Sequence, residues 1–181
     1  MKKQSAILLA IGIILLLVLI FCLSAMGCRN KAIGMEERIK EAHSSIEIAK
    51  KKRKDAVKQL VQVAERYASH EKGIMDDITQ ARQRLENDDV TGAAKTIDVL
   101  VEAYPDIAAG EGYAQLMQEI STCENSILRS RENYNQQVKQ YKRTVRSFPN
   151  KQYLAMMGYD ALDYTYLEFN EELEPDENLF G

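Results

Sequence analysis

The stretch Met35–Ile74, MEERIKEAHSSIEIAKKKRKDAVKQLVQVAERYASHEKGI, decides the fold. Apolar residues recur along it in alternating steps of four and three, the spacing of a heptad seam on one face of a helix. The seam consists of Met35, Ile39, Ala42, Ile46, Ala49, Arg53, Ala56, Leu60, Val63, Tyr67, His70 and Ile74, with Arg53 and His70 as polar members. Because the pattern continues at Ile78, Ala81 and Leu85, we predict one helix from about Met35 to about Asn87.

A second seam follows after a shorter helical stretch. It runs through Tyr113, Leu116, Ile120, Cys123, Ile127, Ser130, Tyr134, Val138, Tyr141, Val145 and Phe148. Pro149 is expected to end this helix, because proline cannot continue the backbone hydrogen bonds. Between the seams, residues from about Thr91 to about Ala103 predict a short helix, capped by Asn87-Asp88-Asp89 and ended by Tyr104-Pro105. Its inward residues are expected to be Ala94, Ile97, Leu100 and Val101.

Composition favours helices over sheets. The chain has 181 residues, of which three are proline, none is tryptophan and 45% are hydrophobic. A helix of about 50 residues needs its apolar face covered, either by other helices or by a second copy of the chain. We therefore predict an all-α fold, in which an N-terminal transmembrane helix is followed by an elongated antiparallel helical bundle.

The apolar segment Ser5–Gly27 carries no charged residue. Its 23 residues would span roughly 35 Å as a helix, enough to cross a hydrocarbon core of about 30 Å. A cleaved signal peptide normally has a shorter apolar region than Ile7–Leu23, and a lipoprotein signal would place the acylated residue at Cys28. Both alternatives remain open, but the length of the segment favours a retained membrane anchor and a location in the cell membrane.

Charge is distributed unevenly beyond this segment. Fourteen Lys and Arg face nine Asp and Glu from Arg29 to Arg84, whereas residues 160–181 hold eight acids and no base. The basic residues on the two sides of the apolar segment are nearly balanced, and they lean toward a cytoplasmic location of the larger part. We predict three regions: a membrane anchor over residues 1–28, a helical bundle over 29–159 and an acidic, flexible tail over 160–181.

The sequence contains no motif for catalysis. Phosphate-binding loops, nucleophile elbows, zinc spacings and haem motifs do not occur, so we nominate no catalytic, cofactor-binding or metal-binding residue and expect a protein that is not an enzyme. The three cysteines, Cys22, Cys28 and Cys123, suggest no disulfide framework. A net charge of −3 gives no reason to expect nucleic acid as a partner.

Several short blocks occur in a fixed order along the chain. They are Lys51-Lys52-Arg53-Lys54, Tyr67-Ala68-Ser69-His70-Glu71, Ala81-Arg82, Tyr104-Pro105, Arg131-Glu132-Asn133-Tyr134-Asn135 with Val138, Tyr141 and Phe148-Pro149, and Met157-Gly158-Tyr159. In these blocks the chain resembles the LemA family of bacterial membrane proteins over nearly its whole length. It departs at Asp55-Ala56-Val57-Lys58, where the family commonly has Asp-Leu-Ile-Pro. The resemblance implies a helical bundle on a membrane anchor, with the short N-terminus outside, but little about mechanism.

One candidate polar layer emerges from the two seams. His70 on the first seam and its neighbour Glu71 would lie near Arg131 and Asn135, which flank the second seam, if the helices are antiparallel. A metal ligand or pH sensor at His70 is the functional interpretation; the structural one, which we favour, is a satisfied core histidine that fixes the helix register. Inside the bundle Arg53 would need an acidic partner, and the alternative is that its long side chain extends out to solvent. The run Lys50–Lys54 is interpreted as a solvated band in preference to a contact with anionic lipid.

These patterns favour a membrane-anchored interaction or scaffold protein. The expected partners are the lipid bilayer and either other proteins or a second copy of the chain. The alternative hypothesis is a membrane-tethered sensor of a ligand or metal ion, with its polar site around His70.

Overall fold

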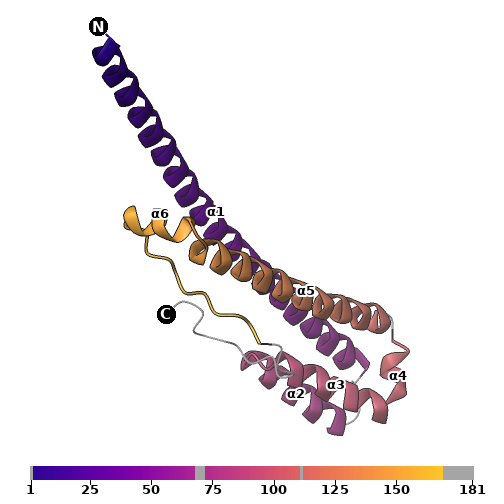
Figure 1. Ribbon diagram of the computed structural model, residues 1–181. Coiled ribbons are helices and arrows are strands. Elements are labelled where there is room, and N and C mark those ends of the chain that lie inside the picture. The colour runs from indigo at the N-terminus through magenta and orange to yellow at the C-terminus, as the bar shows by residue number, and fades with distance from the viewer. Residues whose placement is uncertain (1, 68–71, 111, 169–181) are drawn as a thin grey trace. The chain divides into compact units, whose positions relative to one another are not determined.

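The computed structural model describes residues 2–67, 72–110 and 112–168. These residues form helices and no strand, which confirms the predicted all-α fold (Figure 1). The helices are α1 (Lys2–Tyr67), α2 (Lys72–Glu86), α3 (Val90–Ala103), α4 (Pro105–Ala108), α5 (Tyr113–Arg146) and α6 (Asn150–Met156). The chain divides into two compact units, and α1 and α5 each contribute to both: unit 1 contains residues up to Glu41 together with Tyr134–Leu167, and unit 2 contains Ala42–Asn133.

Unit 1 begins with the apolar segment of α1. Its large side chains from Leu8 to Leu23 are exposed, and within the described residues α1 is the one helix long and apolar enough to cross a membrane. The helix continues without interruption past Cys28, and its side chains then become buried at Ala32 and Ile39. The predicted boundary between anchor and bundle at residue 28 therefore coincides with no change in secondary structure.

The second half of α5 and the helix α6 pack antiparallel to α1 within unit 1. Tyr141 contacts Glu36, Asn150 contacts Cys28, and farther along the chain the ring of Tyr153 meets that of Phe21. Residue numbers thus rise along one element as they fall along the other. The buried residues of this part of the unit are Tyr134, Val138, Tyr141, Val145, Leu154, Tyr164 and Leu167.

The region from Asp160 onward is packed at its start. Residues 160–167 form no helix, but Tyr164 and Leu167 are buried within unit 1. The tail expected from residue 160 thus contributes side chains to the core of the unit through Leu167. The predicted division into anchor, bundle and tail otherwise stays a prediction, because residues 169–181 lie outside the described part.

Unit 2 is built around the remainder of α1. The first seam is buried as predicted at Ala42, Ile46, Ala49, Arg53, Ala56 and Leu60. Beyond Ala56 the buried face widens to include Val57, Val61 and Ala64, because α2, α3 and α5 all contribute to the same core. From these helices the core contains Ile74, Ile78, Ala81, Leu85, Ala93, Ile97, Leu100, Leu116 and Ile120.

The single helix predicted from Met35 to Asn87 is wrong. The structure has two helices in its place, α1 ending at Tyr67 and α2 beginning at Lys72. Arg82 of α2 forms an ion pair with Glu65 of α1, although residues 17 apart would lie about 25 Å from each other in one continuous helix. The chain has therefore reversed direction between them. The apolar period survives this reversal because each helix carries its own stripe of the same spacing.

Helix α3 follows the sequence-based expectation closely. The carboxylate of Asp89 caps it by accepting a hydrogen bond of 2.7 Å from the backbone amide of Gly92. Ile97 and Leu100 are buried as predicted, whereas Ala94 is only half-buried and Ala93 takes the fully buried place.

The end of the second seam differs from the prediction. Helix α5 ends at Arg146, and the side chain of Phe148 is 83% exposed instead of closing the seam. Earlier in the seam pattern, Arg131 is buried where Ser130 was expected. The short helix α6, which follows Pro149, was not anticipated from the sequence.

Candidate functional site

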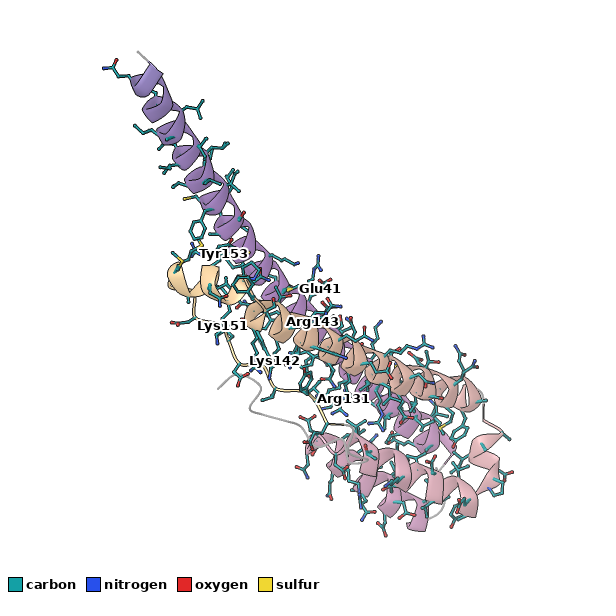
Figure 2. All side chains as sticks on the ribbon, viewed as in Figure 1. Glu41, Arg131, Lys142, Arg143, Lys151 and Tyr153 are labelled. Atoms are coloured by element: carbon teal, nitrogen blue, oxygen red, sulfur yellow. The ribbon has the colours of Figure 1, made fainter. Side chains whose placement is uncertain are left out.

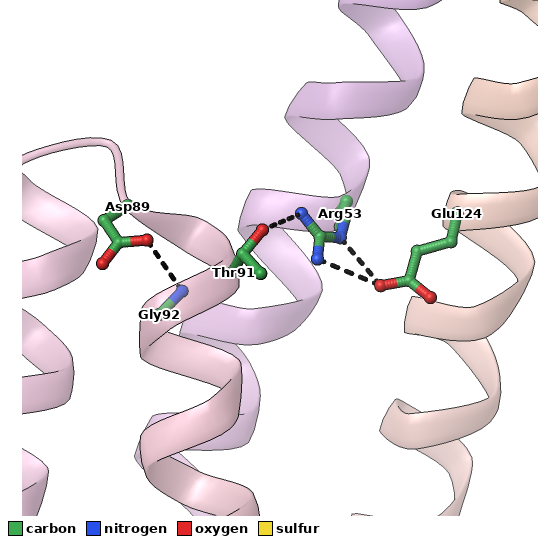
Figure 3. A network of polar contacts seen from close by, with 5 residues as sticks. All are labelled: Arg53, Asp89, Thr91, Gly92 and Glu124. Atoms are coloured by element: carbon green, nitrogen blue, oxygen red, sulfur yellow. Dashed lines mark hydrogen bonds and ion pairs between the residues drawn. The ribbon is translucent and has the colours of Figure 1, made fainter. Parts of the chain in front are cut away.

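Arg53 lies at the centre of a polar network in unit 2 (Figure 3). Its Nε and Nη2 donate hydrogen bonds to the same carboxylate oxygen of Glu124 at 3.2 and 3.0 Å. Its Nη1 donates to the hydroxyl of Thr91 at 3.2 Å. The side chain of Arg53 is 8% exposed and that of Glu124 is 49% exposed. The network therefore neutralises a buried cation and joins α1, α3 and α5.

The sequence left open whether Arg53 pairs with an acid inside the bundle or extends out to solvent, and the structure shows a pair with Glu124. This residue is 71 positions away, and it lies next to Cys123, a member of the second seam. Charged residues that flank a seam commonly pair across helices. That position was the available signal, but Glu119, which lies next to Ile120, shares it.

The basic run Lys50–Lys54 is largely engaged by neighbouring acids. Lys50 pairs with Glu47 at 3.0 Å, and Lys54 forms an ion pair with Asp88. The buried guanidinium of Arg53 and the exposed side chains of Lys51 and Lys52 complete the run. This arrangement is that of a solvated band on a helix whose one buried cation is paired internally.

The predicted polar layer stays a prediction. His70 and Glu71 lie outside the described residues, and Arg131 and Asn135 belong to different units. In unit 2, the side chain of Arg131 is buried, and its Nε has no hydrogen-bond partner among the residues that the structure describes. In unit 1, both ends of the Asn135 amide bind the backbone of Leu167.

A cluster in unit 1 that sequence analysis missed joins Glu36, Tyr141 and Tyr159. The hydroxyls of both tyrosines donate to the same carboxylate oxygen of Glu36, that of Tyr141 at 2.9 Å, and the two hydroxyl oxygens are 3.3 Å apart. The backbone amide of Leu162 donates to the hydroxyl of Tyr141 at 3.0 Å. The ring of Tyr164 meets that of Tyr141 edge to face, with centroids 5.4 Å apart.

Burial and hydrogen bonding keep both of these phenols protonated. Burial is the main cause that raises the pKa of Tyr141 to about 12, and its hydrogen bond to Glu36 adds to the rise. Burial likewise raises the pKa of Tyr159, again with a contribution from the hydrogen bond to Glu36. Neither phenol is suited to act as a base near neutral pH. They serve as donors: Tyr159 attaches the segment after α6 to α1, and Tyr141 attaches α5 to α1.

The cysteines form no disulfide, and their surroundings differ. Cys22 is exposed on the apolar segment, Cys28 donates to the side-chain oxygen of Asn150 at 3.1 Å, and Cys123 is buried on the seam. Burial raises the pKa of the Cys123 thiol, which disfavours the reactive thiolate. Across residues 2–67, 72–110 and 112–168, no group of three or more His, Cys, Asp or Glu side chains converges in a way that could hold a metal ion.

Comparisons with known proteins point in one direction. The model of the LemA family matches residues 42–177 of this chain. A protein named Protein LemA from Metamycoplasma hominis is 28% identical over 128 residues, an alignment that covers 64% of this chain and 58% of that relative. The family match spans most of the chain, including all of the Arg53 network and the Tyr141 and Tyr159 phenols. This chain belongs to the LemA family.

Proposed function

We propose that this protein is a membrane-anchored scaffold, which presents its helical domain to protein partners at the membrane surface and performs no catalysis. The observation that carries the proposal is the composition of α1 within unit 1. One helix contains both the exposed apolar residues from Leu8 to Leu23 and the buried positions Ala32 and Ile39. Exposed apolar side chains in such a continuous row are stable in lipid and unstable in water.

The polar contacts support a structural role. Three polar side chains are of types that often occur in catalytic sites: Arg53, Asn135 and Tyr141. Each of them forms a hydrogen bond that joins one element to another. Sites of catalysis usually leave a reactive group directed into a pocket. In this protein the same types of residue form cross-links between helices and the segment after α6.

The membrane orientation and the partners are part of the proposal. We infer that the larger part of the chain faces the cytoplasm of a bacterial cell, following the lean of the basic residues. The partners are other proteins or a second copy of this chain, since a helical scaffold acts by presenting surfaces.

Extraction of isolated membranes tests the anchor. The full chain is expected to stay in the pellet after washing with alkaline carbonate and to be released by detergent. The double variant Leu15→Lys and Leu19→Lys is expected to enter the soluble fraction, because charges at the centre of a membrane helix are costly. A matched control, Val99→Lys and Leu128→Lys, changes two exposed apolar residues of unit 2 and is expected to remain in the membrane.

Crosslinking in intact membranes tests the scaffold. The expected result is a reproducible adduct with one protein or with a second copy of the chain. Chain that has been unfolded before the crosslinker is added serves as the control and is expected to form no such adduct. A measured turnover of a small molecule by the purified chain, lost on substitution of a single residue, would contradict the proposal.

A further inference from the structure

The end of α5 and the helix α6 form a strongly basic part of unit 1. Residues 134–159 contain five Lys and Arg and no acid, and these cations are Lys139, Lys142, Arg143, Arg146 and Lys151. Arg143, Arg146 and Lys151 are exposed. Figure 2 shows Lys142, Arg143 and Lys151 gathered around the junction of α5 and α6. On α1, Arg29 and Lys31 add two exposed cations directly after the apolar segment.

Two large apolar side chains project from the same region. Phe148, in the turn between α5 and α6, is 83% exposed, and Met156, at the end of α6, is 71% exposed. A pair of exposed apolar residues within a cluster of cations is the composition of surfaces that lie in the interface of a bilayer. There the apolar groups enter the boundary between headgroups and acyl chains, and the cations bind lipid phosphates.

Contacts with α1 place this region at the end of the apolar segment. The ring of Tyr153 on α6 meets the ring of Phe21 edge to face, with centroids 5.1 Å apart. Asn150, at the start of α6, accepts the hydrogen bond from Cys28. Since Phe21 precedes Gly27 by six residues, or roughly 9 Å of helix, α6 lies beside the last turns of the apolar segment. Tyrosine is enriched at that depth of a bilayer.

A groove of about 320 Å³ opens beside α6. Its walls include the basic side chains of Lys142, Arg146 and Lys151 and the apolar side chains of Val145, Leu154 and Leu162. Asp163 also lines the groove and pairs with Lys142 at 3.1 Å and with Arg146 at 3.7 Å. One carboxylate against three cations leaves the groove positive, with an apolar wall beside the charge. This combination matches the headgroup and upper acyl chain of an anionic phospholipid.

We propose that this surface, the interfacial face formed by Arg143, Arg146, Phe148, Lys151 and Met156, binds the anionic lipid surface of the membrane that α1 enters. The inference rests on the proposed membrane anchor. An acidic protein would satisfy the cations equally well. The contact between Tyr153 and Phe21 favours lipid, because it brings α6 against a helix whose other neighbours would be acyl chains.

The test uses the full chain reconstituted in vesicles of phosphatidylcholine and phosphatidylglycerol. With the three native cysteines replaced by serine or alanine, a single cysteine at Met156 (M156C) carries a fluorophore. Two vesicle samples are compared: in one, phosphatidylcholine carries a spin-label quencher at its headgroup, and in the other, phosphatidylglycerol carries it. A matched control carries the fluorophore at Val99 (V99C), another exposed apolar residue, which lies on α3 in unit 2.

We expect the fluorophore at residue 156 to be quenched strongly and the one at residue 99 weakly, with labelled phosphatidylglycerol more effective than labelled phosphatidylcholine. In the variant R143Q/R146Q/K151Q this preference for phosphatidylglycerol is expected to fall about fivefold or more. The variant K51Q/K52Q/K58Q removes the same charge from exposed lysines of unit 2 and is expected to keep the preference. Circular dichroism checks that every variant retains its helix content.

The possible results separate this inference from the proposed anchor. If the chain resists carbonate extraction but residues 156 and 99 are quenched equally, the interfacial face is overturned and the anchor stands. If strong quenching at residue 156 shows no preference for phosphatidylglycerol, the assignment to anionic lipid is overturned. If carbonate extracts the chain, the proposed function and this inference fail together.

Discussion

The side-chain amide of Asn135 binds both backbone groups of Leu167, although 32 residues separate them. Its Nδ2 donates to the carbonyl oxygen of Leu167 at 2.8 Å, and its Oδ1 accepts from the backbone amide at 2.8 Å. An asparagine side chain thereby substitutes for a neighbouring strand. The side chain of Leu167 is buried, and the two hydrogen bonds attach the segment after α6 at its far end.

Replacement of Asn135 by alanine is expected to release this segment. Two hydrogen bonds are lost, each worth about 1 kcal/mol, and the backbone amide and carbonyl of Leu167 must bind water instead. Limited proteolysis should therefore cut the chain faster between residues 157 and 168. The control Gln136→Ala changes an exposed neighbour on the same helix and should leave the cleavage rate as it is. Equal rates in the two variants would show that other contacts are sufficient to keep the segment in place.

Replacement of Glu124 by alanine is expected to destabilise unit 2 by leaving the cation of Arg53 buried without its carboxylate. Loss of one partner of a fully buried pair costs about 3–5 kcal/mol, and the 49% exposure of Glu124 reduces this to roughly 1–2 kcal/mol. Chemical denaturation followed by circular dichroism measures the change. The double variant Arg53→Met and Glu124→Ala should recover part of the loss, because it removes the unpaired charge as well.

The exposed pair of Lys50 and Glu47 provides the matching control for that experiment. Both side chains are more than a third exposed, so Glu47→Gln should change the unfolding free energy by less than about 0.5 kcal/mol. A loss for Glu47→Gln as large as that for Glu124→Ala would refute the importance that we assign to burial of Arg53.

The raised pKa of Tyr141 leads us to expect a loss of stability in alkaline solution. Its pKa is raised from 10.0 to about 12 in the folded chain, so between these values the folded state holds a proton that the unfolded state has released. The stabilisation is thus complete below pH 10 and is lost as pH rises toward 12. The unfolding free energy should fall across this window, and Tyr141→Phe should reduce the slope. Tyr166→Phe, at a half-exposed ring, is the control expected to retain it.

Replacement by alanine is expected to have opposite effects on stability at two glycines with different surroundings, Gly92 and Gly34. A Cβ at Gly92 would overlap the carboxylate of Asp89 and the guanidinium of Arg84, which displaces the cap of α3. Gly92→Ala should therefore cost about 1 kcal/mol, the usual value of a lost cap. At Gly34, within α1, a Cβ meets nothing within 4 Å, and Gly34→Ala should stabilise by roughly 0.5–1 kcal/mol. Thermal unfolding of both variants measures the contrast, and a shift of the same sign would disprove the explanation.

The parts of the fold that depend on local periodicity could be predicted from the sequence. Burial of Ile39, Ile46 and Leu60 follows from a repeat that a helix must place on one face. The cap at Asp89 was likewise readable, because its residue type and position have a local physical cause. The reversal between α1 and α2 could not be read in the same way, since the apolar period continues across it.

The candidate sites were less predictable because their partners lie far apart in the sequence. The sequence left open whether Arg53 pairs with an acid, and nothing local distinguishes Glu124 from other acids of α5. Tyr159 was noted only as part of the block Met157-Gly158-Tyr159, and its hydrogen bond depends on Glu36, which is 123 positions away. Phe148 was misplaced because its spacing fits the seam, whereas the helix that carries the seam ends two residues before it.

The continuity of α1 has a mechanical consequence in unit 1. An α-helix transmits torque, because its backbone hydrogen bonds leave no swivel between successive turns. Rotation of the apolar segment about its own axis therefore turns Glu36 through the same angle and pulls its carboxylate away from the hydroxyls of Tyr141 and Tyr159. The hydrogen bonds of those two phenols resist such twisting, and they couple the rotation of the apolar segment to the position of α5 and of the segment after α6.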